Sequence, residues 1–216
     1  MARAILNPSR QREFRSNTRR KAIVQLAAVR FLDQGYAGTT MSGIAAALGG
    51  SKGTLWRYFP SKELLFVAVV DRLTEEFYMH LSQILNECQD FESTMRRFCQ
   101  EFVQKITSPQ GYSLLKLVVA ESRRFPEIAA TFNERCSSAT QLQLAEFLSR
   151  AIATNQLRQA DPLLAAKQLM GLCRAGAHYR LLTGAINSVE PADIERDSED
   201  ALALFLLAHG TERLSD

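Results

Sequence analysis

The chain has 216 residues, of which 46% are hydrophobic and 23% are charged, so it can fold as one large or two small globular domains. No apolar run approaches the roughly 20 residues that span a bilayer, and no apolar segment follows the first arginines as in a signal peptide. We therefore expect a cytoplasmic protein without membrane contact. The four cysteines show no C-x-x-C spacing and the three histidines lie far apart, so we expect no metal site and no cofactor. The cysteines are expected to be reduced thiols that serve as buried apolar residues, and a redox-sensing role is the alternative.

The formal charge is distributed unevenly along the chain. Residues 1–62 contain 11 Lys and Arg against 2 Asp and Glu, a net charge of +9. Residues 63–216 contain 15 against 21, a net charge of −6. A basic segment beside an acidic body is typical of nucleic-acid-binding proteins, because Lys and Arg neutralise phosphates. The pattern predicts a nucleic-acid-binding domain over residues 1–62 and a second domain over residues 63–216.

Residues 1–14 are predicted to form a mobile basic arm, whose arginines can meet phosphates or reach a minor groove. A frayed, solvated terminus is an equally good interpretation of the first eight residues. A helix is then predicted from about residue 17 to residue 34, because apolar side chains recur there at helical spacing. Gly35 is expected to close this helix.

The stretch from residue 39 to residue 62, TTMSGIAAALGGSKGTLWRYFPSK, reads as two short helices joined by a glycine turn. Thr40 is suited to cap the first helix, and the Gly49–Gly50 pair ends it. Ser51 then caps a second helix over residues 52–58. These are the parts of a helix-turn-helix, whose second helix enters the major groove of DNA. Helix pairs of this kind also occur outside DNA-binding proteins, which is the alternative.

The pattern TT-x3-IA-x2-LG-x-SKGTLWRYFPSKELL resembles the DNA-binding domain of the TetR family of bacterial transcriptional regulators. The resemblance runs from about residue 15 to about residue 65 and includes the cap, the turn, the second helix and the following cap in order. Three positions depart from the commonest pattern, in which an acidic residue, valine and tyrosine are frequent: Gly43, Gly50 and Trp56. A glycine inside a helix costs about 0.5–1 kcal/mol of stability relative to alanine. The tryptophan bears on which base or phosphate is touched.

The resemblance, together with exposure on the second helix, indicates which side chains contact DNA. Base contacts are expected from Ser42, Lys52, Gly53, Thr54 and Trp56. Phosphate contacts are expected from Thr40, Tyr58 and Lys62, and Arg57 is a further phosphate candidate. The implied partner is a palindromic double-stranded DNA operator, bound by a homodimer.

Beyond residue 61 apolar residues recur at helical spacing and no strand pattern occurs. The sequence therefore predicts an all-α fold of about nine helices, with an N-terminal three-helix domain that contains the helix-turn-helix and a C-terminal helical bundle. A long helix is expected from Ser61 to about residue 89. Further helices are expected at residues 91–107, 112–124, 126–155, 161–182 and 191–209. Pro109 and Gly111 are interpreted as a break between two of them.

The helical body resembles the ligand-binding and dimerisation domain of the same family in the number and order of its helices. The resemblance implies a cavity for a small hydrophobic effector, aromatic or acyl-bearing. The candidate wall residues are Phe98, Phe102, Tyr112, Val119 and Cys173, with Arg174 or His178 as the polar contact. Ordinary core packing is an equally good interpretation of each residue taken singly.

The last two helices are expected to pair with those of a second copy of the chain. The run ALALFLLA at residues 201–208 is apolar on more faces than one core contact can cover. The predicted interface residues are Leu202, Phe205 and Leu206. A helix packed wholly within one chain is the alternative.

These observations favour a ligand-responsive transcriptional repressor. An activator, or a regulator without a ligand, fits the same residues and is the alternative. An enzyme is not supported, because the chain has no Gly-rich phosphate loop after a strand, no metal-ligand spacing and no nucleophile motif.

Overall fold

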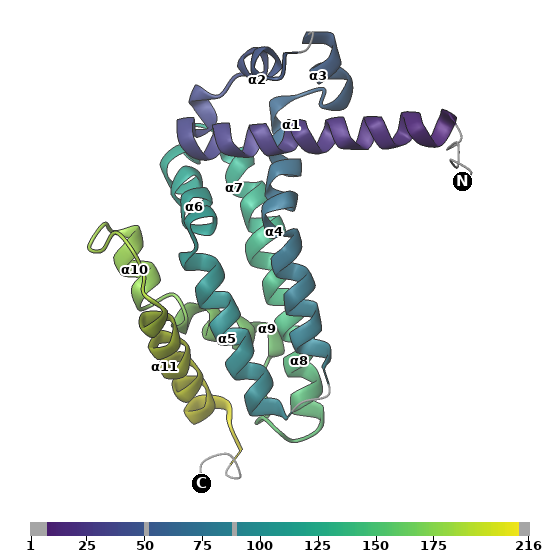
Figure 1. The fold of residues 1–216 in the computed structure, drawn as a ribbon. Helices are drawn as coiled ribbons and strands as arrows, with labels where there is room; N and C mark the ends of the chain where they lie inside the picture. Colours follow the sequence, from purple (N-terminus) through teal and green to yellow (C-terminus); the bar gives the residue numbers. More distant parts are fainter. Residues whose placement is uncertain (1–7, 50–51, 88–89, 212–216) are drawn as a thin grey trace, which may run out of the picture. The chain divides into compact units, whose positions relative to one another are not determined.

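The computed structural model describes residues 8–49, 52–87 and 90–211. Over these ranges the regular structure is helical, apart from one isolated bridge between Leu157 and Gly210, and the prediction of an all-α fold is confirmed (Figure 1). None of the described helices is long and apolar enough to cross a membrane. The chain divides into two compact units, the first formed by Met1–Arg72 with Leu117–Ala129 and the second by Leu73–Lys116 with Ala130–Asp216.

The first unit combines helices from the first 72 residues with a short segment from later in the chain, residues 117–129. The contributing helices are α1 (Pro8–Gly38), α2 (Met41–Ala47), α3 (Lys52–Tyr58), the start of α4 (Lys62–Asn86), the end of α6 (Pro109–Glu121) and the start of α7 (Pro126–Phe132). Large side chains less than 4% exposed form its core: Ile23, Phe31, Tyr36, Ile44, Leu55, Phe59 and Phe66. The rings of Phe31, Tyr36 and Phe66 have centroids within 5.5 Å of one another, so aromatic packing joins α1 to α4.

The first helix is longer than the sequence predicted. It begins at Pro8, so the prediction of a mobile arm is wrong from Pro8 onward. Proline is favoured in the first turn of a helix, where its missing N–H has no helical partner. The rest of the predicted arm, residues 1–7, lies outside the described residues. Helical geometry is interrupted at Gly35 (φ 75°, ψ 170°), where the helix was predicted to close.

The second unit is a helical bundle around one core. Besides parts of α4 and α6 it contains α5 (Phe91–Thr107), a π-helix (Asn133–Ser138), α8 (Ala139–Ala153), α9 (Pro162–Leu172), α10 (Ala177–Leu182) and α11 (Pro191–His209). Apolar side chains of α5, α8, α9 and α11 meet in that core. Asp90 and Asp161 cap α5 and α9, because their carboxylates accept hydrogen bonds from backbone amides of the first turn.

Three of the predicted helices differ from the observed ones. α6 begins at Pro109, so Pro109 and Gly111 lie in its first turn and do not form a break. The helix predicted at residues 126–155 contains the π-helix between α7 and α8. The helix predicted at residues 161–182 is broken between α9 and α10.

The break between α9 and α10 depends on Asp197 of α11. Its carboxylate accepts a hydrogen bond from the amide of Ala177, the first residue of α10. A Cβ atom on Gly176 would lie 2.2 Å from a carboxylate oxygen of Asp197, so glycine is required beside this contact. Because the acceptor lies 20 residues away in the sequence, helical periodicity could not indicate the break.

Replacing Gly176 by alanine is expected to lower the free energy of unfolding by about 1–3 kcal/mol, because the new Cβ atom would displace the Asp197 carboxylate and leave the Ala177 amide unpaired. Gly171→Ala is the matched control in α9. Nothing lies within 4 Å of its Cβ position, so alanine should raise stability there by about 0.5–1 kcal/mol. Urea unfolding followed by circular dichroism measures both. Equal effects would contradict the role given to Asp197.

Candidate DNA-binding surface and effector cavity

The first unit contains the helix pair that the sequence predicted. Thr40 caps α2, since its side-chain oxygen accepts a hydrogen bond from the Gly43 amide at 3.0 Å. Leu48 ends α2, and Gly49 follows with a positive φ of 61°. The predicted turn residue Gly50 and the predicted cap Ser51 lie outside the described residues.

Two neighbouring arginines of α1 hold this helix pair. The Arg19 guanidinium donates a hydrogen bond to the Leu48 carbonyl at 3.2 Å, at the C-terminal end of α2, where the helix dipole favours a cation. The Arg20 guanidinium lies 5.0 Å from the centroid of the Phe59 ring, directly after α3. One turn of α1 therefore positions the ends of both short helices.

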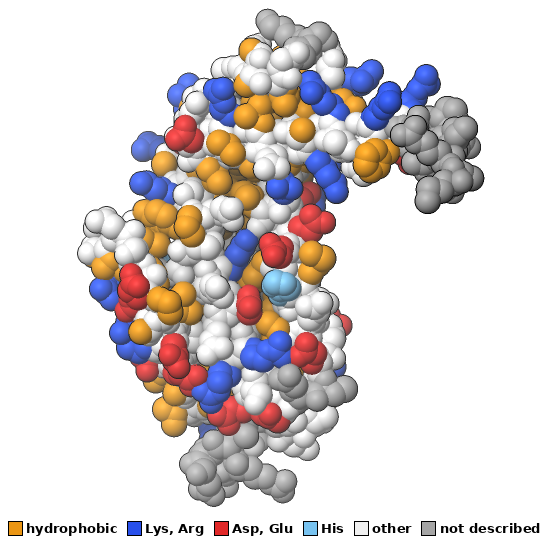
Figure 2. Space-filling view, viewed as in Figure 1, with side chains coloured by type: hydrophobic (Ala, Val, Ile, Leu, Met, Phe, Trp, Pro, Cys, Tyr) orange, Lys and Arg blue, Asp and Glu red, His pale blue; other side chains and the backbone are white. Residues whose placement is uncertain are grey.

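The outer face of α3 carries most of the predicted DNA contacts. Leu55, 2% exposed, anchors the helix in the core. The residues that are exposed or half-buried on this helix are Gly53, Thr54, Trp56, Arg57 and Tyr58. Thr40 and Ser42 are exposed on the neighbouring α2, and the side chain of Lys52 lies outside the described structure. Lys and Arg side chains gather on the first unit around α1 (Figure 2), as a phosphate-binding surface requires.

Lys62, a predicted phosphate contact, packs against aromatic rings in the free chain. Its ammonium lies 4.1 Å from the centroid of the Tyr36 ring and 5.8 Å from that of Phe125. Burial lowers the pKa of Lys62, and the Glu121 carboxylate partly offsets this effect. The phosphate contact of Lys62 stays a prediction, in which the ammonium would exchange the Tyr36 ring for a phosphate.

Glu121, the last residue of α6, holds the end of α1. Its two carboxylate oxygens accept hydrogen bonds from the amides of Tyr36 and Ala37, each at 2.6 Å. Gly35 departs from helical geometry directly before them, with a φ of 75° that favours glycine. A Cβ atom on Gly35 would also lie 2.5 Å from a Glu121 oxygen. Glu121 could not be identified from the sequence, because it lies 85 residues from Tyr36.

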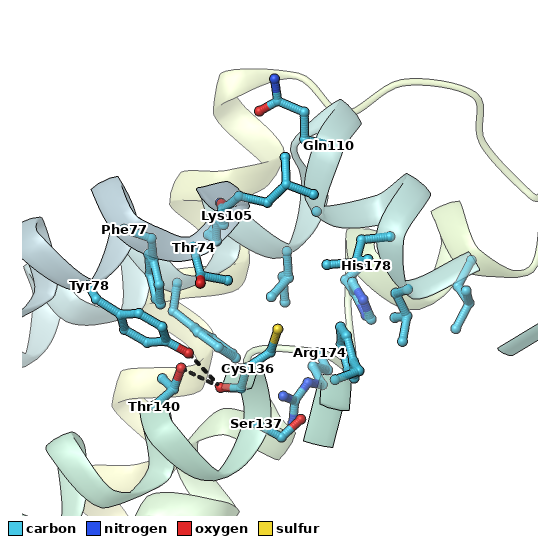
Figure 3. A pocket seen from close by; sticks show the side chains of 18 residues that line it. Thr74, Phe77, Tyr78, Lys105, Gln110, Cys136, Ser137, Thr140, Arg174 and His178 are labelled. Carbon is cyan, nitrogen blue, oxygen red and sulfur yellow. Dashed lines mark hydrogen bonds between the residues drawn. The ribbon is translucent and has the colours of Figure 1, made fainter. Parts of the chain in front are cut away.

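The second unit contains a cavity with a volume of about 350 Å³ (Figure 3). Residues of α4, α5, α6, α7, α8, α10 and the π-helix line it, together with Arg174 between α9 and α10. Eight of the 18 lining residues have aliphatic or phenyl side chains: Leu73, Phe77, Phe102, Ile106, Leu114, Leu115, Phe132 and Leu182. The size and the apolar lining are those of small-molecule sites between bundle helices.

Three basic side chains reach the cavity: Lys105, Arg174 and His178. The Lys105 ammonium donates a hydrogen bond to the Leu73 carbonyl at 2.5 Å, and the Arg174 guanidinium lies 5.2 Å from the centroid of the Phe102 ring. Burial lowers the pKa of Lys105. Burial, and then the charge of Arg174, lower the pKa of His178, so this imidazole is neutral at pH 7.

The π-helix supplies a second polar part of the lining. The Tyr78 hydroxyl donates to the Arg135 carbonyl and lies 3.1 Å from the Cys136 carbonyl oxygen, which also accepts from the Thr140 hydroxyl at 2.8 Å (Figure 3). Helical segments of this wider form are rare and occur frequently at functional sites. The sequence predicted an uninterrupted α-helix here.

The structure brings three of the predicted pocket residues to the cavity: Phe102, Arg174 and His178. The other four are corrected. Phe98 and Cys173 are fully buried in the core cluster, Tyr112 is half-buried outside the lining, and Val119 is 61% exposed in the first unit. Helical periodicity indicates which side chains are buried, but it does not indicate which of them meet a void.

Sequence reasoning also missed Lys105. The available signal was a cation on the apolar face of α5, three residues after Phe102 and directly before Ile106. Lysine is rarely buried unless it is paired, so its presence on such a face indicates a particular role.

The predicted interface residues of α11 also require correction. Leu202 and Phe205 are 2% and 1% exposed and belong to the core of their own chain, and Leu206 is half-buried. The leucines of this run that point outward are Leu204 and Leu207, 53% and 71% exposed. Because the run is apolar on every face, the sequence could not indicate which face is internal.

Both parts of the chain match known protein families. Residues 23–69 match the family model of the bacterial regulatory proteins of the tetR family. Residues 93–211, more than half of the chain, match the C-terminal domain of AefR-like transcriptional repressors. The chain belongs to the TetR family of DNA-binding transcriptional regulators. The resemblance noted in the sequence is thereby confirmed.

Individual TetR-family relatives support the assignment. The transcriptional regulator RutR of Escherichia coli K12 is 30% identical over 132 residues, which are 61% of this chain and 54% of RutR, so the chain spans about half the length of this curated relative. The flavonoid-responsive regulator FrrA is 30% identical, with 91% of this chain and 99% of FrrA covered and a TM-score of 0.76. A TetR-family regulator from Mesorhizobium loti MAFF303099, 24% identical with the same coverage and a TM-score of 0.81, shows the same fold.

In this TetR-family chain, Glu121→Ala is expected to lower the free energy of unfolding by about 1–3 kcal/mol, because two backbone amides lose a charged acceptor. Amide hydrogen exchange at Tyr36 and Ala37 should accelerate. Asp33→Ala, an exposed carboxylate of α1, is the control and should change stability by less than about 0.5 kcal/mol. Unchanged exchange at both amides would show that Glu121 does not hold the end of α1.

Proposed function

We propose that this TetR-family regulator is a repressor that binds operator DNA as a homodimer and is released when a small, largely apolar molecule enters the cavity of the second unit. The cavity carries the proposal. A partly open cavity of about 350 Å³ with a largely apolar lining, beside the hydrophobic core of the second unit, has the size and character of a small-molecule site. The match to a repressor-domain family and the name of the flavonoid-responsive relative FrrA support this assignment.

The proposed DNA contacts lie on α2 and α3 and at the start of α4. Base contacts are assigned to Ser42, Lys52, Gly53, Thr54 and Trp56. Phosphate contacts are assigned to Thr40, Arg57, Tyr58 and Lys62, the first residue of α4. The Arg57 guanidinium lies 5.4 Å from the centroid of the Tyr58 ring, which supports a shared phosphate. Hydrogen bonding with Ser16, and then with Arg57, lowers the pKa of the Tyr58 hydroxyl.

Arg57→Ala is expected to weaken binding to all DNA sequences alike and to reduce the slope of log affinity against log salt by about 1, because one phosphate contact is lost. Thr54→Val should instead change the preferred sequence. Arg72→Ala is the control, since Arg72 is an exposed arginine of α4 whose guanidinium bonds to Gln25. Fluorescence anisotropy over a salt series, with DNA selected from a random library, measures all three. An unchanged slope in Arg57→Ala would remove Arg57 from the phosphate contacts.

The proposed dimer interface is formed by α10 and α11. Tyr179 on α10 is 60% exposed, and the exposed Leu204 and Leu207 are three residues apart, on one face of α11. Figure 2 shows hydrophobic side chains at the surface in this part of the second unit. Apolar side chains grouped in this way usually mark an interaction site.

Leu207→Glu is expected to convert the dimer into a folded monomer that has lost most of its operator affinity, because a buried carboxylate would oppose association. Leu142→Glu is the matched control: Leu142 is 61% exposed on α8, outside the proposed interface. Light scattering measures the mass of each variant, and circular dichroism checks its fold. A monomeric wild-type protein would rule out this part of the proposal.

Release by the effector requires that the ligand bind one conformation more tightly than another. The coupling between two sites in one protein is typically about 1–3 kcal/mol, so a saturating effector should weaken operator binding by about 5- to 150-fold. Thermal-shift screening finds stabilising compounds, and operator anisotropy then tests each one. Transcript levels in a strain that lacks the gene distinguish a repressor from an activator. Transcripts of the target genes should rise in that strain, and a fall would indicate an activator.

A further inference from the structure

The cavity lining contains two formal cations and no carboxylate. Lys105 and Arg174 are among the 18 lining residues, none of which is Asp or Glu. Across the described part of the chain, neither cation forms an ion pair. All lining residues belong to the second unit, so the site is complete within that unit.

The contacts that the two cations do make leave most of their donors unused. Arg174 carries five N–H donors, and its contact among the described residues is the face of the Phe102 ring at 5.2 Å. Lys105 carries three donors, of which one bonds to the Leu73 carbonyl, and its ammonium lies 5.9 Å from the centroid of the Phe77 ring. Both cations therefore retain capacity for an acceptor inside the cavity.

Both cations line the same cavity. Phe102 and Lys105 are three residues apart on α5 and share a face of that helix. Arg174, which follows α9, lies over Phe102 and so approaches the same face. Figure 3 shows both side chains at one cavity, although they come from different parts of the chain.

An unpaired cation in a partly buried site is unfavourable, because burial removes water without supplying a counter-charge. Consistent with this, burial lowers the pKa of both Lys105 and Arg174, and the charge of the Glu76 carboxylate offsets this effect only in part at Lys105. A guest with a negative charge would form charge-assisted hydrogen bonds with both groups, and a carboxylate matches the planar fork of a guanidinium. A neutral guest would leave the cations unpaired, and a cationic guest would be repelled.

We propose that the effector is an amphipathic organic acid, whose carboxylate pairs with Arg174 and Lys105 and whose apolar body lies among the aromatic and aliphatic side chains of the cavity. This inference rests on the proposed function and names the ligand class for the same site. The volume of about 350 Å³ equals that of roughly a dozen water molecules at about 30 Å³ each, which suits a bicyclic aromatic acid or a medium-chain fatty acid.

The test uses three probes with one carbon skeleton and different charges: 2-naphthoate, 2-naphthamide and 2-naphthylmethylamine. Calorimetry on the wild-type protein at neutral pH should give an affinity for naphthoate at least about tenfold above that for the amide, the effect of one charge-assisted hydrogen bond. The amine should bind most weakly. Decanoate and decanamide repeat the comparison on an aliphatic skeleton.

Variants then test the two cations. Arg174→Met and Lys105→Met should each reduce the preference for the acid over the amide about tenfold, whereas Lys105→Arg, which keeps the charge, should retain most of it. Arg150→Met is the matched control: Arg150 also lies over a phenylalanine, 5.7 Å from the centroid of Phe147, but outside the cavity. It should retain the full preference, and circular dichroism confirms that each variant is folded.

The proposal is overturned if acid and amide bind equally on both skeletons, if neither skeleton binds, or if the preference survives in both methionine variants. Fluorescence anisotropy with operator DNA then tests the carboxylate site and the proposed function separately. Acids that bind with the expected preference but leave operator affinity unchanged would support the carboxylate site and contradict the effector response. If only neutral compounds bind the protein and release it from DNA, the effector response is supported and the carboxylate site is overturned.

Discussion

The DNA-binding unit depends on one carboxylate from a distant part of the chain. The Glu121 carboxylate accepts hydrogen bonds from the amides of Tyr36 and Ala37, where α1 departs from helical geometry. The Tyr36 ring is thereby fixed against Phe31, Phe66 and Phe125. Thr39 lies just before α2, and its hydroxyl donates a hydrogen bond to the Gly35 carbonyl at 2.8 Å. This bond ties the start of α2 to the end of α1. The orientation of the helix-turn-helix therefore follows from a contact that the first 72 residues cannot make alone.

The helix that provides this carboxylate also lines the cavity. Leu114 and Leu115 of α6 contribute to the lining, and Glu121 lies about 10 Å further along the same helix, at 1.5 Å per residue.

Much of the fold could be predicted from local sequence. Thr40 and Ser61 signal helix starts, and both side chains accept hydrogen bonds from first-turn amides as expected. The bounds of α5 and α11 follow from apolar periodicity and flanking residues, and the family pattern over residues 39–62 indicates the helix-turn-helix. These features are set by interactions between residues a few positions apart, which a sequence displays directly.

The site depended more on tertiary contacts. The sequence predicted Phe102, Arg174 and His178 near a ligand. The cavity is also lined by Lys105, whose signal was overlooked, and by a π-helix, for which the sequence has no local signal. By itself, the sequence determined most of the helices, several of their caps, the basic segment and the family. Only the tertiary structure decided which buried face meets a void, which face of α11 is external, and which carboxylate ends α1. The reason is physical: periodicity sets the faces of a helix, whereas long-range packing selects the partner of each face.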